Sequence, residues 1–316
     1  MDNNLSYTVI ICAVLFGADE TLLNVNLGNG FKFRRMSLIP SKDNLDTIFE
    51  IDDVGLRREY ETARIDAVLE VVCAFKSYTI CLDRIEVEKY YSKMCDDVLK
   101  YLDDTIRAIR LFIEGPVRFK KLSVKMKSEI ECVDETEMSK SFSRIISIGE
   151  AMKTNTISKF HCEDKEINEL NNNISLRKFP LVDEVLNNCH RYYDLSYQQD
   201  NFISITLLIT CLEILFLNSE KAKKEKLAKR CSVYLYDSKD ERINCYYKLL
   251  KVYKKRSDFV HDGDCLQVEN EDILFLRECV RKSLVKYLNN QHSKKDTIQE
   301  LKKIIENLDY WSEKKQ

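Results

Sequence analysis

Arg256 and His261 are the residues of this sequence whose types and spacing are best suited to chemistry. They lie five positions apart in the stretch LLKVYKKRSDFVHDG, which runs from Leu249 to Gly263. An arginine guanidinium can hold a phosphate through two parallel hydrogen bonds, and a histidine imidazole moves protons near neutral pH. Phosphate chemistry is one interpretation of this pair, and an ion pair at a helix end is the other.

The geometry of a helix restricts how these two side chains can meet. Five residues at 100° each place Arg256 and His261 about 140° apart on a continuous helix, with Val260 over Arg256 instead. One chain brings them together only if the helix loosens near Phe259, and Gly263 is a plausible terminator. The second route is a two-fold dimer, in which the same patch of each subunit pools two Arg and two His.

The segment around the pair resembles a known family of small helical domains, the Apea-like branch of the HEPN family. The resemblance covers Leu207 to Leu288. It rests on the order and spacing of four pieces: CLEILF at Cys211–Phe216, KLAKR at Lys226–Arg230, KLLKVYKKRSDFVHDG at Lys248–Gly263, and an amphipathic helix from Glu271.

The resemblance implies an all-α helical bundle that acts as a dimeric, metal-independent endoribonuclease. In that family, Arg followed after four to six residues by His is the RNA-cleaving signature, and Arg256 to His261 fits it. His261 would act as the acid or base on a ribose 2′-OH, and Arg256 would hold the phosphate. The products would be a 2′,3′-cyclic phosphate and a 5′-OH. Members often serve in prokaryotic antiviral defence or as toxins, and no cofactor is implied.

Three further residues are candidates for supporting roles. Glu213 lies on an otherwise apolar helix, so we expect it to pair with a cation, for which Arg256, Lys229 and Arg230 are candidates. Many catalytic members of the family carry Asn, Asp or His directly after the Arg, whereas here Ser257 follows it and Asp258 comes next. Asp258 could orient His261 or face solvent.

A local excess of positive charge precedes the pair. From Lys221 to Arg256 there are thirteen Lys and Arg against four acids, an excess of nine in a chain of net charge −2. Such a patch would attract an RNA backbone, and the candidate RNA-binding residues are Lys229, Arg230, Lys254 and Lys255. A solvated helix face is the alternative.

Composition describes a folded globular protein. The 316 residues are 44% hydrophobic and 32% charged, and 7 Gly with 3 Pro favour long regular elements. The 12 Cys form no C-x-x-C pair, so we expect reduced, mostly buried thiols in a cytoplasmic protein without zinc. With only four His, none at ligand spacing with carboxylates, the sequence predicts no metal site. We expect neither a membrane span nor a targeting segment.

The first 160 residues are predicted to form an α+β domain. Patterns of alternation and helical spacing indicate strands at Tyr7–Phe16, within Ala67–Ile85 and within Pro116–Cys132, a long helix at Lys89–Glu114 and a short one at Ser139–Met152. Asn29-Gly30 predicts a hairpin turn. A phosphate loop at Gly28–Gly30 is disfavoured, because no further Gly and no helix start follow. Lys153–Ile167 is the predicted linker.

Residues 166–316 are predicted to form the HEPN-like helical domain. The expected helices are Leu181–Tyr193, opened by Pro180, then Asn201–Leu217, Lys221–Tyr236, Lys239–Phe259, Asp272–Asn290 and Lys295–Trp311. Asn201–Leu217 is apolar on nearly every face and should lie at the centre.

The leading hypothesis is a nuclease domain that acts on RNA as a homodimer, with the N-terminal domain binding an unknown trigger. The alternative is a catalytically inactive dimerisation or nucleotide- and RNA-binding module of the same fold, which Ser257 and the near-neutral total charge favour.

Overall fold

The computed structural model describes most of the chain in two compact units. The described residues are 4–37, 70–83, 85–113, 115, 117–128, 141–147, 161–173, 179–218, 221–262, 268–290 and 293–312. The first unit comprises residues 1–151 and 157–178, and the second comprises 152–156 and 179–316. An α+β unit followed by a helical unit is the fold class expected from the sequence.

A five-stranded antiparallel sheet forms the body of the first unit. Its strands, in the order β2-β3-β1-β4-β5, are β1 Asn4–Phe16, β2 Lys32–Ser37, β3 Glu70–Asp83, β4 Arg118–Ser128 and β5 Phe142–Ser147. The central strand β1 pairs with β3 and β4, and its residues 11–16 are all buried. This run of apolar, partly β-branched residues suits a strand that has neighbours on both sides, and the strand prediction is confirmed.

The predicted short helix at Ser139–Met152 is wrong, because its described part is the edge strand β5. Phe142 to Ser147 pairs in register with β4, with Phe142 opposite Met126. The stretch FSRIIS is rich in aromatic and β-branched residues, and β4 satisfies its backbone groups, so non-local pairing decides the structure here.

A turn at Asn29-Gly30 is present, as predicted, but the predicted hairpin is wrong, because the turn closes only an isolated bridge between Gly28 and Phe31. Both residues have positive φ, 49° and 76°, and the amide of Phe31 donates to the carbonyl of Gly28 over 2.9 Å. These are the dihedrals of the two-residue turn that Asn-Gly favours. The chain then continues into β2, which pairs with β3 rather than with the segment before the turn.

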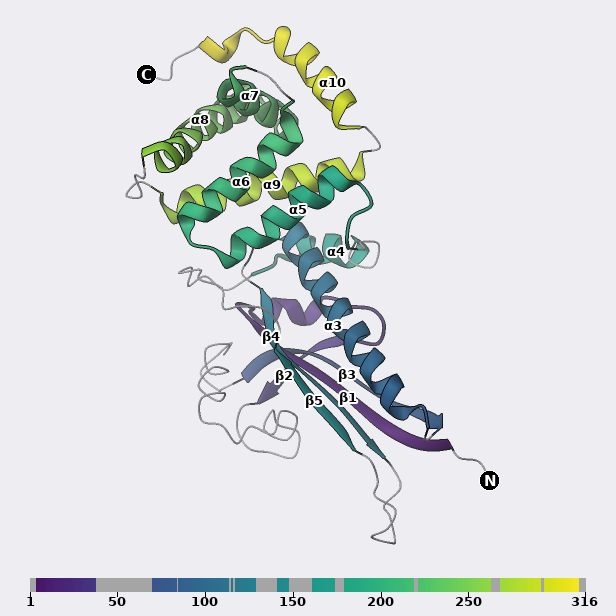
Figure 1. Cartoon of the computed structure of the whole chain (residues 1–316). Coiled ribbons are helices and arrows are strands. Elements are labelled where there is room, and N and C mark those ends of the chain that lie inside the picture. The colour runs from purple at the N-terminus through teal and green to yellow at the C-terminus, as the bar shows by residue number, and fades with distance from the viewer. Residues whose placement is uncertain are drawn as a thin grey trace. The chain divides into compact units, whose positions relative to one another are not determined.

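The helix α3, Val87–Phe112, packs against the sheet (Figure 1). Its buried residues recur at three- and four-residue spacing and include Val98, Leu102 and Ile106, as predicted. The Tyr91 hydroxyl donates to the carbonyl of Val124 in β4 over 2.7 Å, which fixes the helix to the strand.

The helix α4, Asp164–Asn173, belongs to the first unit. The Asn171 side chain accepts from the amide of Asn26 over 2.7 Å and donates to the carbonyl of Asn24 over 3.1 Å. The predicted linker Lys153–Ile167 is therefore wrong at its end, where α4 has begun. Among the described residues the second unit begins at Phe179, later than the expected residue 166.

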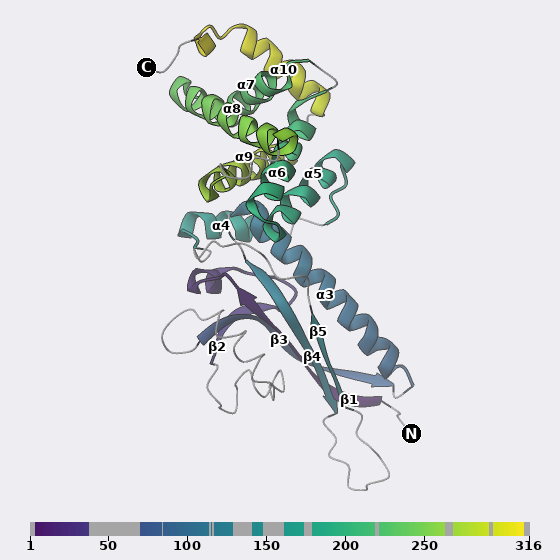
Figure 2. The same cartoon turned by 60° about the vertical axis from the view of Figure 1, so that its left-hand side comes forward.

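The second unit is a helical bundle built around α6 (Figures 1 and 2). All six predicted helices are present: α5 Glu184–Leu195, α6 Asn201–Phe216, α7 Lys223–Leu235, α8 Lys239–Asp262, α9 Asn270–Asn289 and α10 Lys294–Glu306, with short 3-10 turns at Ser196–Gln198 and Tyr310–Ser312. The apolar helix α6 packs against α5, α7, α8 and α9, so it is the central helix that its composition predicted.

Pro180 does not open α5, contrary to the prediction. The helix begins at Glu184, and the carboxylate of Asp183 accepts from the amide of Leu186 over 2.9 Å as its N-terminal cap. A capping carboxylate satisfies an amide that the first helical turn leaves unpaired, and here it determines the start.

The cysteines of the described residues are all free thiols, and all except Cys81 are buried. This confirms, for that part of the chain, that they serve as small hydrophobic residues. Within the described residues, no helix combines the length and the apolar character that a membrane crossing requires.

Candidate functional site

The helix α8 runs without a break through both candidate catalytic residues and ends at Asp262. The loosening near Phe259 that would bring Arg256 and His261 together within one chain is therefore absent. Gly263 lies outside the described residues. The two side chains leave the helix about 140° apart, and they occupy different environments.

Arg256 lies on the side of α8 that faces the bundle. It shares a row of the helix with Leu249 and Val252, both buried, and with Val260, which is 46% exposed. The side chain is half-buried, and its Nε is buried and has no hydrogen-bond partner among the described residues. No ion pair to a carboxylate of the described residues neutralises it. A guanidinium in this position keeps its capacity to bind an anion.

His261 lies on the solvent side of the last turn of α8 and is exposed. It shares this side with Lys254, seven positions earlier, and with Asp258 between them. Ser257, Asp258 and Phe259 are each half-buried. The imidazole is accessible to a substrate or to a second protein molecule.

Glu213 does not form the expected ion pair with Arg256, Lys229 or Arg230. Its Oε1 accepts a hydrogen bond from the Tyr253 hydroxyl over 2.7 Å, which joins α6 to α8. Burial raises the pKa of Tyr253 to about 12, and the neighbouring carboxylate of Glu213 adds to the shift, whereas Arg256 opposes it. Tyr253 therefore stays a neutral donor at physiological pH.

Lys255, predicted to bind RNA, is a structural residue. It is 8% exposed, and its Nζ donates to Oδ2 of Asp272 over 2.7 Å. Asp272 is 5% exposed, and it also accepts from the amide of Glu269 as part of the capping box that starts α9. The pair joins the end of α8 to the start of α9, and the RNA-binding prediction for Lys255 does not fit this position.

Arg230 is likewise enclosed. It is 3% exposed, and its Nη1 donates to the carbonyl of Phe216, at the end of α6, over 2.8 Å. Lys229 is half-buried with its Nζ 5.8 Å from the ring centre of Trp311. Of the four predicted RNA-binding residues, Lys254 alone is fully exposed.

The sequence contained a signal for these two buried cations. Lys255 is three positions after Val252 and four before Phe259, and Arg230 is three after Leu227. Helical rows of this kind place a side chain among apolar neighbours, so periodicity predicts their burial where a count of charges does not.

The ends of three helices meet around the last turn of α8. The rings of Phe202 and Phe259 stack with centroids 5.5 Å apart, which joins the start of α6 to the end of α8. The Asn201 amide donates to the side chain of Asn270 over 2.8 Å, which joins the starts of α6 and α9. Figure 1 shows these three helix ends together on one side of the bundle.

Among the described residues, no group of three or more His, Cys, Asp and Glu side chains is placed so that it could hold a metal ion. The chain matches no protein-family model, no curated protein and no solved structure with which it was compared. The function proposed next therefore depends on the residues described above and on the resemblance of the sequence.

Proposed function

We propose that the helical unit is a HEPN-type endoribonuclease that cuts RNA as a homodimer, with Arg256 and His261 as its catalytic residues. The observation that carries this proposal is the state of Arg256. Its guanidinium is half-buried, and within the described part of the chain its Nε has no hydrogen-bond partner and no carboxylate neutralises it. A positioned cation without a counter-ion is suited to a phosphate, because the anion supplies the missing hydrogen bonds.

A second copy of the chain accounts for the separation of the two residues. Since Arg256 and His261 diverge on one helix, the guanidinium of one subunit meets the imidazole of the other across a two-fold axis. Three large apolar side chains are exposed on the helices that meet here: Ile203 at 43%, Val260 at 46% and Leu274 at 37%. A second subunit would remove this apolar surface from water.

The reaction is a transfer within the RNA chain. One copy of His261 takes the proton from a ribose 2′-OH, and the 2′ oxygen attacks the adjacent phosphorus while the bond to the 5′ oxygen breaks. The leaving 5′ oxygen takes its proton from water, so one His261 and one Arg256 suffice for each cut. Arg256 stabilises the charge that develops on the phosphate oxygens. DNA lacks the 2′-OH and is not a substrate.

Cleavage of cellular RNA in EDTA tests this proposal, with purified wild type beside Arg256→Ala and His261→Ala. We expect both variants to lose activity by about a hundredfold or more while remaining folded, and the wild type to leave 2′,3′-cyclic ends. Lys254→Ala is the matched control, since this exposed lysine shares the face of His261, and it should lose only a few-fold. Equal rates in all four proteins would contradict the assignment.

Mixing the two inactive variants tests the composite site. A dimer of one Arg256→Ala chain and one His261→Ala chain retains one arginine and one histidine on different subunits. Random pairing makes half of the dimers mixed, with one of two Arg–His pairs intact, so recovery should reach about a quarter of wild-type activity. No recovery in dimers shown to be mixed would place both residues of a pair on one chain, which the geometry of α8 opposes.

A catalytically inactive dimerisation or RNA-binding module is the second candidate function. Two observations favour it. Ser257 directly follows Arg256, and the side chains of Arg230 and Lys255 are buried rather than on the surface. Growth arrest on overexpression that His261→Ala relieves would support a toxin or antiviral nuclease. A wild type that stays inert even with extract of phage-infected cells, yet still dimerises, would support the inactive module.

A further inference from the structure

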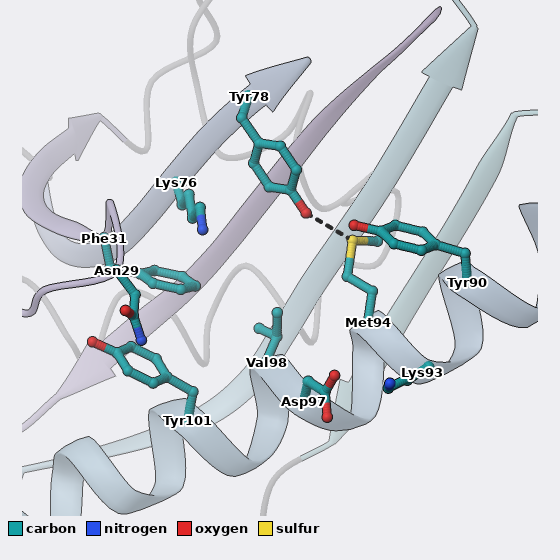
Figure 3. A pocket seen from close by; sticks show the side chains of 10 residues that line it. All are labelled: Asn29, Phe31, Lys76, Tyr78, Tyr90, Lys93, Met94, Asp97, Val98 and Tyr101. Carbon is teal, nitrogen blue, oxygen red and sulfur yellow. Dashed lines mark hydrogen bonds between the residues drawn. The ribbon is translucent and has the colours of Figure 1, made fainter. Parts of the chain in front are cut away.

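The first unit contains a cavity of about 500 Å³ between α3, the strand β3 and the turn at Asn29-Gly30 (Figure 3). Aromatic rings stand at its two ends, Phe31 with Tyr101 at one and Tyr78 with Tyr90 at the other, and Lys76 lies between them. Its volume falls within the range of pockets that enclose small organic molecules.

Contacts with neighbouring residues hold the rings of Phe31, Tyr101 and Tyr78 in place. Phe31 and Tyr101 stack with centroids 5.2 Å apart and an interplanar angle of 21°, and the Tyr101 hydroxyl donates to the carbonyl of Leu27. At the other end the Tyr78 hydroxyl donates to the sulfur of Met94 over 3.0 Å. Rings fixed in this way offer flat faces to a ligand with little loss of conformational entropy on binding.

Lys76 places a positive charge between the rings. Its Nζ is 4.8 Å from the ring centre of Tyr78 and 5.4 Å from that of Phe31. These distances are within the range of cation–π attraction. The side chain is half-buried, and no carboxylate of the described residues forms an ion pair with it. An anion that entered the cavity would meet a positioned ammonium group.

The turn beside the cavity lies next to the Lys76 side chain. A Cβ on Gly30 would lie 3.4 Å from the Cε of Lys76 and 3.9 Å from its Nζ. Glycine at this point adopts the positive φ of 76° without strain, and the Lys76 side chain passes beside it. The Gly28-Asn29-Gly30 segment is thus a tight turn beside a lysine, not a phosphate loop of the kind that opens a helix.

The helix α3 supplies the rest of the lining in two rows of four-residue spacing. Met94 and Val98 line the cavity between the aromatic pairs (Figure 3), and both are buried. Lys93 and Asp97 lie one row over and are exposed. The lining therefore has two ammonium groups, one carboxylate and the amide of Asn29, so it is positively charged and can also bond to the polar edge of a ring.

We propose that this cavity binds a small molecule that joins a flat aromatic ring to an anionic group, with a mononucleotide as the matching chemistry. The ring lies against the tyrosine faces, and the phosphate binds Lys76. Lys93 adds attraction at the rim, and Asn29 or Asp97 bonds to the ring edge. The proposal concerns the first unit and stands apart from the nuclease function.

Calorimetric titration of the full-length protein tests it with the nucleoside monophosphates AMP, GMP, CMP and UMP, and with adenosine and inorganic phosphate as partial ligands. At least one monophosphate should bind, and its affinity should exceed that of its separate parts by about tenfold or more, because ring and phosphate act together. No binding of any monophosphate at millimolar concentration would overturn the proposal, as would adenosine binding as well as AMP.

Variants assign the binding to this cavity. Lys76→Met keeps the length of the side chain and should weaken monophosphate binding by about tenfold or more. Tyr90→Ala removes one flat face and should weaken it similarly. Lys127→Met is the matched control, because Lys127 is an exposed strand lysine of β4 outside the cavity, and its affinity should stay unchanged. Melting curves establish that each variant is folded.

A single-stranded RNA of four nucleotides is titrated as a further ligand, because it carries the same rings and phosphate groups on a longer chain. Binding of this RNA without binding of any mononucleotide would overturn the proposal, since the cavity would then be part of an RNA groove. Equal affinities of the wild type and folded Lys76→Met would also overturn it, because the ammonium group would then take no part.

Discussion

Removing the charge of Lys255 should destabilise the helical unit strongly. Its ammonium group and the carboxylate of Asp272 are 2.7 Å apart, and both side chains are less than a tenth exposed. Breaking a buried pair leaves an uncompensated charge and costs about 3–5 kcal/mol. Asp272 keeps its hydrogen bond from the amide of Glu269, so Lys255→Met should lie near the lower end, at about 3 kcal/mol.

Urea unfolding followed by tryptophan fluorescence measures this change. Trp311 is the one tryptophan of the chain, and it lies 5.1 Å from the ring of Tyr246, so its emission reports on the helical unit. Lys254→Met, one position earlier and exposed, is the control and should change stability by about 0.5 kcal/mol or less. Lys255→Met/Asp272→Asn should cost less than the two single changes added together.

A different outcome would refute the reasoning. If Lys255→Met matched Lys254→Met in stability but lost RNA binding, Lys255 would be an RNA contact and its buried ion pair would contribute nothing. If Lys255 is instead a structural residue, Lys255→Met should lose RNA cleavage only in proportion to the fraction of the variant that is unfolded.

Three further predictions concern other contacts. Tyr253→Phe removes the hydrogen bond to Glu213 and should lower the free energy of unfolding in urea by about 1 kcal/mol. Because the pKa of Tyr253 in the folded protein is raised to about 12, its contribution to the free energy of unfolding should be constant below pH 10 and fall between pH 10 and 12. The hydrogen bond to Asp19 raises the pKa of His161 above its usual 6.5, so any stabilisation from the pair is present below pH 6.5 and is lost as pH rises through the folded pKa. NMR titration should show that pKa return toward 6.5 in Asp19→Asn. Gly30→Ala should destabilise the first unit by about 1 kcal/mol or more in thermal melts, because alanine disfavours a positive φ.

The elements that the sequence predicted well are those whose structure is decided locally. Asn201–Phe216 has no charge before Glu213 and is apolar on most sides, and it is the central helix of its unit. Asn29-Gly30 carries its backbone preference in its own two residues. The edge strand Phe142–Ser147 was missed, because its partner β4 lies elsewhere in the sequence and short apolar segments fit either period.

Contacts between distant segments limited the prediction of the sites. The burial of Lys255 depends on Asp272, which lies on another helix, and the partner of Glu213 is a tyrosine rather than a cation. The cavity of the first unit joins the turn at Asn29-Gly30, the strand at Lys76 and one face of α3. No local pattern connects these segments, so folding alone brings the lysine and the rings together.

The regularity of α8 narrows the proposed active site to its last two turns. Up to Lys255 this helix is held on its inner side by buried residues and the ion pair with Asp272. Beyond that point Val260 and His261 are exposed, while Arg256 remains at the border. An anion that reached Arg256 within one molecule would lie on the opposite side of the helix from His261, since five residues rotate the helix by about 140° beyond a full turn. If the pair acts on one phosphate, the histidine must therefore come from another subunit, and dilution below the dimer dissociation constant should abolish cleavage while leaving the fold of each unit intact.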